Sequence, residues 1–284
     1  MINLHVAEGW KDYELLDSGN GQKLEKWGNI LTIRPDPRAI WQKTDKSFWD
    51  SAEGVFSDNG WKFETSVPLT WQIAYKNIRF VLKPTEFKHT GVFPEQAVNW
   101  NWIQDKLKNH KTDIKILNLF AYTGGATIAA ASTFGVHVTH VDASRPAMMW
   151  ASENAKLSRI SPDRIRWIQD DCLKFVKREI KRGMKYDGII MDPPKFGRGM
   201  KGEVWKLLED LPHLANECKQ IMSDTPLFFL INAYSADMSS LVLENLLSGI
   251  SKDWGGQLES GELGIKESSG GRILPAGIFT RWSK

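Results

Sequence analysis

The sequence has few cysteines, no long apolar run and little net charge. Its two cysteines, Cys172 and Cys218, are too few for a disulfide framework or a zinc site. No stretch approaches the run of about 18 apolar residues that indicates a membrane-spanning helix. The first residues lack the basic and apolar regions of a secretory signal. We therefore expect a globular, cytoplasmic protein that binds neither a membrane nor a metal.

Residues 1–88 show the short runs and turns of a small β-rich domain. Asn20-Gly21 and Asp58-Asn59-Gly60 are hairpin-type turn signals. Residues 71–75 and 78–82 alternate around Lys76-Asn77, which predicts an antiparallel hairpin with one buried face. Six of the thirteen tryptophans lie before residue 75. They either fill the core of this domain, which we favour, or form a surface on which nucleic-acid bases stack.

Residues 89–284 form a second domain in which strands and helices alternate. Ser144 and Pro146 mark the start of one helix, as N-cap and first-turn residue. The alternation predicts an α/β fold whose mostly parallel, Rossmann-like sheet has helices on both faces and ends in an antiparallel hairpin. The expected strands are 114–120, 137–141, 164–169, 186–191, 226–232, 257–265 and 273–282, and the expected helices are 126–134, 146–157, 172–182, 204–222 and 239–250.

Suggestive chemistry follows several of the predicted parallel strands, at the edge where such sheets bind ligands. The first strand leads into a turn with Gly124 and Gly125, which allow close approach of a ligand but do not form the dinucleotide motif G-x-G-x-x-G. Asp142 follows the second strand, where a carboxylate accepts hydrogen bonds from ribose hydroxyls, and Asp171 follows the third, near an adenine amino group. Either aspartate alone could instead cap a helix. Together these features indicate a nucleoside-type ligand without a phosphate cradle, S-adenosylmethionine (SAM).

The sequence resembles the class I SAM-dependent methyltransferases, and within them the RlmI-like group of bacterial large-subunit rRNA methyltransferases. The segments that carry the resemblance are HTGVFPEQ (89–96), NLFAYTGG (118–125), HVDAS (140–144), QDDCLKF (169–175) and MDPPKFGRG (191–199). The resemblance implies a seven-stranded sheet, SAM as cofactor, S-adenosylhomocysteine as its product, and rRNA or another RNA as the partner. The PUA domain with which many relatives begin is not recognisable in residues 1–60.

The resemblance also assigns individual residues to the cofactor and to the methyl acceptor. It implies that the acceptor contacts Asp192, Pro193, Pro194, Lys195 and Phe196, with Arg198, Tyr234 and Ser235 as further substrate-binding residues. The alternative for the motif D-P-P-x-F is a capped strand end with Phe196 in the core. The implied cofactor-binding residues are Phe93, Gln96, Phe120, Tyr122, Thr123, Gly124, Gly125, Asp142, Ala143, Ser144, Asp171, Cys172 and Asp192.

The sequence departs from those relatives that methylate carbon 5 of cytosine. They use a cysteine thiolate in the loop after the fifth strand, because the ring carbon becomes nucleophilic only after a thiolate adds beside it. Here that loop reads LINAYSADMS, with Tyr234 at the expected position of the thiol. Cys172 falls in the predicted adenine pocket and Cys218 within a helix. We therefore predict direct methyl transfer without a cysteine nucleophile, to a nitrogen or oxygen atom.

Basic residues are concentrated between Lys174 and Lys206, where ten Lys and Arg residues face four Asp and Glu residues. This excess could contact phosphates or could be a solvated helix face. Three functions remain open: methylation of an RNA base, which we favour, methylation of a non-RNA acceptor, and a catalytically silent module that binds SAM and RNA. A nicotinamide oxidoreductase is disfavoured because the dinucleotide motif is absent.

Overall fold

The computed structural model describes residues 3–44, 46–64, 67–86, 88–110, 113–199, 202–234 and 238–284. The chain forms two compact units. The α/β unit comprises Met1–Leu4, Asn99–Glu262 and Gly277–Lys284, and the β unit comprises His5–Val98 and Leu263–Ala276. The boundary predicted between residues 88 and 89 therefore falls within the β unit. That unit also takes up the tip of the C-terminal hairpin, a segment that we had assigned to the second domain.

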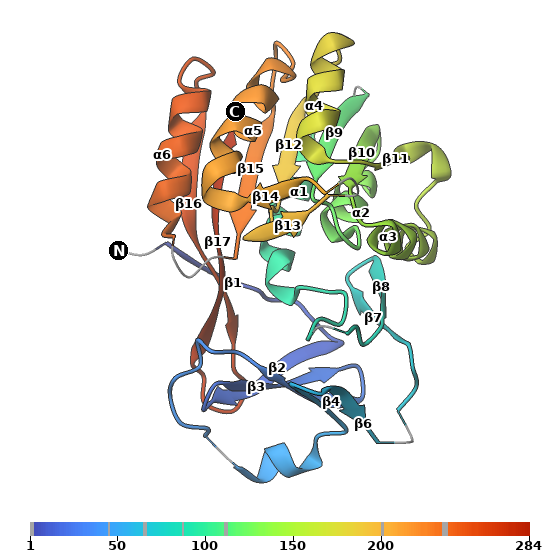
Figure 1. The fold of residues 1–284 in the computed structure, drawn as a ribbon, viewed down its shortest axis with the longest axis vertical. Helices are drawn as coiled ribbons and strands as arrows, with labels where there is room; N and C mark the ends of the chain where they lie inside the picture. Colours follow the sequence, from blue (N-terminus) through green and yellow to red (C-terminus); the bar gives the residue numbers. More distant parts are fainter. Residues whose placement is uncertain are drawn as a thin grey trace. The chain divides into compact units, whose positions relative to one another are not determined.

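The α/β unit is built on a sheet that has eight strands among the described residues, in the order β1-β16-β17-β15-β12-β9-β10-β11 (Figure 1). Its parallel part pairs β10 with β11 and β9, β12 with β9, and β15 with β12, and β17 then pairs antiparallel with β15. The predicted α/β sheet with an antiparallel end is confirmed, and the short strand β1 extends it. The strands are β1 (Leu4–Val6), β9 (Ile114–Leu119), β10 (Val136–Asp142), β11 (Ile165–Gln169), β12 (Gly188–Met191), β15 (Phe228–Ala233), β16 (Gln257–Lys266) and β17 (Ile273–Ser283).

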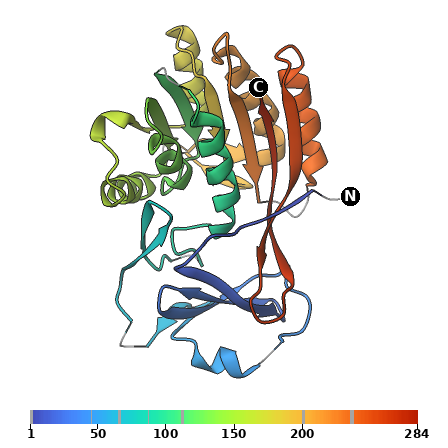
Figure 2. The ribbon, with the colours of Figure 1, turned by 180° about the vertical axis from the view of Figure 1, so that it is seen from behind.

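Helices cover both faces of this sheet. Helices α4, α5 and α6 lie on the face seen in Figure 1, and α1 lies on the face seen in Figure 2. Ser144 caps α3, accepting a hydrogen bond from the Ala147 amide, as its position in the sequence predicts. None of the described helices has the length and apolar character that crossing a membrane requires. The helices are α1 (Ala97–Leu107), α2 (Gly125–Ala131), α3 (Arg145–Leu157), α4 (Cys172–Lys181), α5 (Leu207–Gln220) and α6 (Ser240–Ser251), with short 3-10 turns at Lys46–Ser51, Pro94–Gln96 and Pro162–Arg164.

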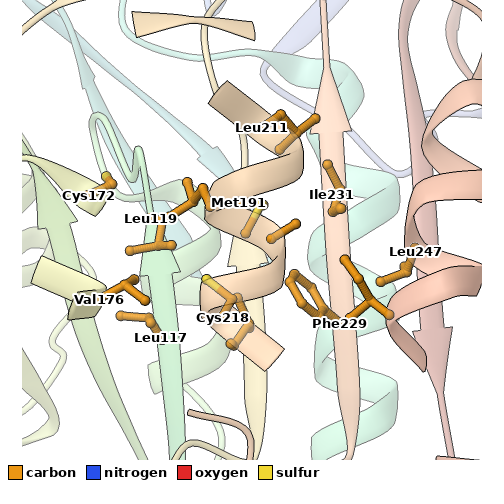
Figure 3. Close-up of a cluster of buried hydrophobic side chains, with 14 of the residues drawn as sticks. Leu117, Leu119, Cys172, Val176, Met191, Leu211, Cys218, Phe229, Ile231 and Leu247 are labelled. Carbon is orange, nitrogen blue, oxygen red and sulfur yellow. The ribbon is translucent and has the colours of Figure 1, made fainter. Parts of the chain in front are cut away.

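One large apolar core lies between the sheet and helices α4, α5 and α6 (Figure 3). Strands β9, β12 and β15 are buried along nearly their whole length, as expected for central parallel strands covered on both faces. This core fixes the position of the strand ends that carry the candidate site. Its members include Leu117, Leu119, Val176, Met191, Leu211, Cys218, Phe229, Ile231 and Leu247.

The β unit contains a five-stranded sheet and a separate hairpin. The sheet runs β2 (Tyr13–Gly19), β3 (Gln22–Trp27), β4 (Ile30–Pro35), β5 (Gly54–Ser57) and β6 (Gly60–Phe63), and the hairpin pairs β7 (Trp71–Tyr75) with β8 (Ile78–Leu82). Asn20 and Gly21 have φ values of 52° and 75°, so both adopt the left-handed conformation of a type I′ hairpin turn. The hairpin predicted around Lys76-Asn77 is confirmed, with Tyr75 opposite Ile78.

The tryptophans of the β unit divide between its core and its surface. Trp27 and Trp49 are buried, as the core interpretation predicts, whereas Trp61 and Trp71 are half-buried. The core also contains a salt bridge in which Arg34 donates from Nε and Nη2 to the Glu25 carboxylate at 2.6 and 2.8 Å. Such bidentate pairs hold a buried charge that would otherwise be costly.

Candidate active site at the carboxyl ends of the strands

The site lies at the point where the order of the strands reverses. From β9 the chain proceeds to β10 and β11 on one side, and then crosses to β12 and β15 on the other. Leu119 is in register with Val141 on β10 and with Met191 on β12, and Met191 is in register with Ile231 on β15. The next residue of each strand therefore belongs to one row at the carboxyl edge. This row, which we call the edge row, consists of Asp142, Phe120, Asp192 and Asn232, and it occupies the usual ligand position of such sheets.

The loop after β9 has an unusual backbone. Phe120, Tyr122 and Gly124 have φ values of 54°, 48° and 88°, and positive φ costs of order 1–3 kcal/mol at a residue other than glycine. Hydrogen bonds from Ala121 N to Val141 O and from Gly124 N to Ala121 O hold the loop in this conformation. The left-handed conformation of Phe120 and Tyr122 thus turns the chain away from the strand direction at the sheet edge. Such strain is found where a backbone is shaped for a ligand.

The two glycines of this loop have different reasons to be glycine. Gly124 has positive φ, and a Cβ there would also lie 3.1 Å from the Ala151 Cβ. A Cβ on Gly125 would lie 2.6 Å from the Trp100 ring, so this glycine allows close packing against α1. Thr123 is buried, and its carbonyl accepts a hydrogen bond from Asn154 Nδ2. Gly125 and Thr123 therefore hold the loop against the neighbouring helices α1 and α3.

Asp142 ends β10 and is fixed by backbone amides. Its Oδ2 accepts from Tyr122 N and its Oδ1 from Ser144 N, both at 2.8 Å. Burial raises the pKa of Asp142, and these two hydrogen bonds oppose that rise. Each oxygen retains further acceptor capacity, because an ionised carboxylate offers about four lone-pair positions. Ser144, and not Asp142, is the N-cap of α3, so the capping alternative for Asp142 is wrong.

Asp171 does cap a helix. It is the N-cap of α4 and accepts a hydrogen bond from Lys174 N at 2.9 Å. The preceding loop is joined to the edge row, because Asp170 N donates to the Asp142 carbonyl at 3.1 Å. Cys172 follows as the first residue of α4 and is buried. Capping uses one oxygen of Asp171, so a second role toward adenine stays a prediction.

Asp192 follows β12 and is held by a side chain from the next strand. Asn232 Nδ2 donates to Asp192 Oδ1 at 2.9 Å. Asn232 is itself buried, and its Oδ1 accepts from Asn99 Nδ2 of α1 at 3.4 Å. This contact orients Asn232 so that its amide nitrogen faces the aspartate. The carboxylate of the D-P-P motif is thus positioned by an amide that the sequence alone did not reveal.

A two-stranded ribbon follows directly after the D-P-P turn. It pairs β13 (Phe196–Arg198) with β14 (Val204–Lys206), a segment that we had predicted to be helical. Trp205 on β14 donates from Nε1 to the Pro194 carbonyl at 2.8 Å, and its ring lies 4.8 Å from that of Phe120. The indole therefore joins the loop after β9 to the turn after β12.

The other predicted acceptor residues occupy different settings. Pro193 is buried, while Pro194, Lys195 and Arg198 are exposed. Phe196 is 54% exposed, which overturns the alternative that places it in the core. Tyr234 follows β15, half-buried, and its ring lies 3.3 Å from where a Cβ on Gly277 would be. Ser235 lies outside the described residues.

Phe93 and Gln96 belong to the β unit. Phe93 precedes the 3-10 turn Pro94–Gln96 and its ring lies 5.1 Å from His89, while Gln96 is buried. Burial and neighbouring cations lower the pKa of His89 to about 4, so its imidazole is neutral at physiological pH. The role that we predicted for Phe93 and Gln96 toward the cofactor stays a prediction.

Neither cysteine has the surroundings of a nucleophile. Both thiols are free and buried in the core shown in Figure 3, Cys172 at the start of α4 and Cys218 within α5. Burial raises the pKa of both thiols well above the ordinary value. A thiol in this state is protonated at neutral pH and is a poor nucleophile.

Three basic residues in or just after α4 are paired within the protein. Lys174 forms an ion pair with Glu203, Arg178 with Asp170, and Arg182 with Glu179. These three of the ten cations between Lys174 and Lys206 therefore belong to a solvated, salt-bridged helix face. The exposed cations beside the D-P-P turn are a separate group, formed by Lys195, Arg198 and Lys206.

Two residues of the site were missed by sequence reasoning, Asn232 and Trp205. The sequence does contain a signal for Asn232, because it is the only polar residue in the run FFLIN and stands at its end. Trp205 has no such signal, because the run VWKLL predicts the start of a helix. Its position depends on the ribbon, which forms by pairing Gly197 with Trp205 across a turn.

The fold and the edge row define an α/β protein with two carboxylates, Asp142 and Asp192, at the edge of the sheet where such proteins bind ligands. Residues 54–224 match the family model described as S-adenosylmethionine-dependent methyltransferase. The crystal structure of a SAM-dependent methyltransferase from Agrobacterium tumefaciens shares 39% sequence identity, with a TM-score of 0.94 over 99% of this chain and 93% of that chain. The chain therefore belongs to the SAM-dependent methyltransferase family, and its cofactor is SAM.

More distant or more local similarities add detail. Ribosomal RNA large subunit methyltransferase K/L from Shewanella frigidimarina is 35% identical over 46% of this chain, and that from Chromohalobacter salexigens is 34% identical over 63% of it. The matches span only 18% and 22% of those proteins. A protein of Streptococcus mutans described as a methyltransferase shares the fold, with a TM-score of 0.75 at 16% identity over 97% of this chain and 76% of that chain.

The described residues fit SAM in charge and in hydrogen-bonding character. At the end of β10, beside the strained loop, Asp142 has remaining acceptor positions of the kind that a ribose diol requires. SAM carries a sulfonium cation, and the edge row offers the carboxylates of Asp142 and Asp192 together with the Phe120 ring. The bent loop replaces the phosphate-binding glycine motif of dinucleotide sites, which a ligand without phosphate does not need.

Proposed function

We propose that this protein transfers a methyl group from SAM to a nitrogen or oxygen atom of a base in RNA, with ribosomal RNA as the first candidate. The observation that carries the proposal is the edge row, in which Asp142 and Asp192 lie on either side of Phe120; we assign Asp142 to the ribose of SAM and Asp192 to the methyl acceptor. The relatives named as large-subunit rRNA methyltransferases support RNA as the substrate class.

On the cofactor side, we assign Asp142 to the ribose hydroxyls. Its two backbone hydrogen bonds fix the carboxylate before the ligand arrives, so that little ordering is needed on binding. Phe120, Tyr122 and Gly124 form the bent loop beside the methionine moiety, and Asp171 with the Cys172 backbone lies toward adenine. The roles of Thr123, Gly125, Ala143 and Ser144 are to hold this loop and the start of α3 in place.

On the acceptor side, we assign Asp192 to a hydrogen bond from the amino group of the target base. SAM supplies an electrophilic methyl group, so the protein mainly aligns the lone pair of the acceptor and excludes water. Asn232 donates to Oδ1 of Asp192 and so orients the carboxylate that we assign to the substrate. The Trp205 indole keeps the Pro194 carbonyl, and with it the turn, at a fixed distance from Phe120.

The acceptor atom is a nitrogen or oxygen and not carbon 5 of a pyrimidine. Methylation of that carbon by the thiolate route requires an accessible, ionised cysteine. Cys172 and Cys218 are buried and their thiol pKa values are raised. An exocyclic amino group of a base has N–H donors, from which Asp192 can accept a hydrogen bond.

The test is transfer of tritium from methyl-labelled SAM into separated RNA, protein and small-molecule fractions from a strain that lacks the gene. We expect label in RNA with the wild-type protein and none with Asp192→Ala, while calorimetry shows that this variant still binds SAM. Label confined to protein or small molecules would show a different acceptor. SAM binding without transfer to any fraction would show a catalytically silent module.

A further inference from the structure

The β13–β14 ribbon has two faces of different character. In a two-stranded ribbon, neighbouring residues point to opposite faces and cross-strand partners point to the same face. Phe196 pairs with Lys206, Gly197 with Trp205, and Arg198 with Val204. Gly197 and Trp205 therefore share one face, and the other face consists of Phe196, Arg198, Val204 and Lys206. We call these the inner and the outer face.

The inner face points into the protein. Trp205 is half-buried, donates to the Pro194 carbonyl and packs against Phe120. A Cβ on Gly197 would lie 3.5 Å from Pro194 Cγ and 3.7 Å from Trp205 Cβ, which confirms that this glycine is on the inner side. These contacts fix the orientation of the whole ribbon beside the D-P-P turn.

The outer face is exposed and combines apolar and basic side chains. Phe196 and Val204 are 54% and 53% exposed, and Arg198 and Lys206 are exposed as well. Lys206 contacts Glu209 at the start of α5 in an exposed pair, a kind that contributes little in water. The outer positions of β13 and β14 themselves include two cations and no carboxylate, so the face favours a polyanion.

We propose that the outer face docks an unpaired stretch of RNA next to the target nucleotide. Phe196 stacks on a flanking base, and Arg198 and Lys206 contact phosphates, the combination by which proteins bind single strands. Duplex RNA does not offer its base faces in this way. The proposal rests on the proposed function. It assigns Phe196 to a flanking base outside the reaction pocket, and not to the target base.

The position of the ribbon suits a flanking nucleotide. Phe196 is four residues beyond Asp192, and four extended residues span at most about 14 Å. The intervening prolines stiffen this segment, and Trp205 anchors the ribbon from the other face. The outer face is therefore close enough to Asp192 for a strand docked there to carry the nucleotide that flanks the methyl acceptor.

The test uses a fluorescein-labelled single-stranded RNA of twelve mixed nucleotides, with the same strand in a duplex, and follows binding by anisotropy. We expect Phe196→Ala to weaken binding of the single strand by about 5-fold to about 150-fold, from 1–3 kcal/mol per stacked base. Phe196→Trp, which keeps an aromatic ring at this position, should bind the single strand as the wild type does. Arg198→Ala and Lys206→Ala should each reduce the slope of log K against log salt by about 0.7.

Two control variants match these changes at the opposite edge of the sheet. Phe134→Ala removes an aromatic ring that is 82% exposed before β10, and Lys115→Ala removes an exposed cation at the start of β9. Neither should change binding of the single strand. Single-strand affinity that is unchanged in Phe196→Ala, or weakened equally for the duplex, overturns the proposal. Wild-type methylation of RNA is measured in parallel, so a failure of the proposed function itself is seen separately as absence of label in RNA.

Discussion

The hydrogen bond from Asn232 to Asp192 gives a direct test of how the acceptor carboxylate is positioned. Asn232 is 1% exposed, and its Nδ2 lies 2.9 Å from Asp192 Oδ1. Asn232→Leu keeps nearly the same volume but removes the donor. A hydrogen bond to a charged group contributes about 1.5–3 kcal/mol. If this energy serves to position the carboxylate in the transition state, we expect the methyl-transfer rate to fall by about 10-fold to about 150-fold.

The assay separates positioning from binding and folding. Single-turnover transfer from saturating labelled SAM to RNA of a gene-deletion strain gives the rate constant, and calorimetry gives the affinity for SAM. We expect the affinity to change less than twofold, because Asn232 lies on the β15 side of the edge row and Asp142 on the β10 side. Asn232→Asp should be at least as slow, because it places a second carboxyl group against Asp192.

A matched control uses another buried asparagine of the same sheet. Asn118 on β9 is 2% exposed, and its Nδ2 donates to Thr127 Oγ1 at 2.9 Å. Asn118→Leu should lower the melting temperature in the same way as Asn232→Leu but leave the transfer rate of the folded protein nearly unchanged. Asn232 does not position Asp192 for transfer if Asn232→Leu folds, binds SAM and transfers methyl groups at the wild-type rate.

Three further predictions concern other parts of the α/β unit. Replacing both Cys172 and Cys218 with alanine should keep the methyl-transfer rate within about twofold of the wild-type rate, since any difference would come from packing alone. Loss of transfer with SAM still bound would instead support a thiolate mechanism. Trp205→Phe keeps the ring but removes the hydrogen bond to the Pro194 carbonyl, so steady-state turnover should fall by about 2-fold to about 10-fold, and Trp205→Ala should be slower still. Burial alone would raise the pKa of Glu179, but hydrogen bonds from Tyr186 and two arginines hold it below its usual value. The ionised Glu179 therefore contributes to stability above the unfolded-state pKa, and this contribution is lost as the pH falls through the lower folded-state pKa. Glu179→Gln should lower the melting temperature at pH 7 and much less at pH 3, and an equal loss at both pH values would contradict this.

The placement of Asp142 and Asp192 at one edge of the sheet could be predicted from the sequence, because it depends on local signals. Parallel strands end at one edge, so Asp142 and Asp192 could be placed near one another once β10 and β12 were recognised as strands. The hydrogen bonds of Asp142 come from backbone amides a few residues away or at the neighbouring strand end. These contacts follow from the course of the chain itself, whatever the neighbouring side chains are.

The ribbon and the first strand could not be predicted in the same way. The segment Val204–Lys206 has the apolar spacing of a helix start, and its strand conformation depends on pairing with Phe196–Arg198. In the structure, Asp210 Oδ2 accepts a hydrogen bond from Lys206 N, and α5 begins at Leu207 instead of Val204. Strand β1 pairs with β16, a partner some 250 residues away, and no local pattern indicates such a contact.

The two carboxylates of the edge row differ in what holds them, and this difference has a consequence for specificity. Asp142 is fixed by main-chain amides, which every substitution preserves so long as the loop keeps its conformation. Asp192 is fixed by the side chain of Asn232, and its turn is fixed by the side chain of Trp205. Side chains can change without altering the fold, so substitutions on β15 and β14 can change the acceptor while SAM binding persists. We therefore expect substitutions of Asn232 and Trp205, which support the D-P-P-K-F motif from outside it, to alter methyl transfer more than SAM binding.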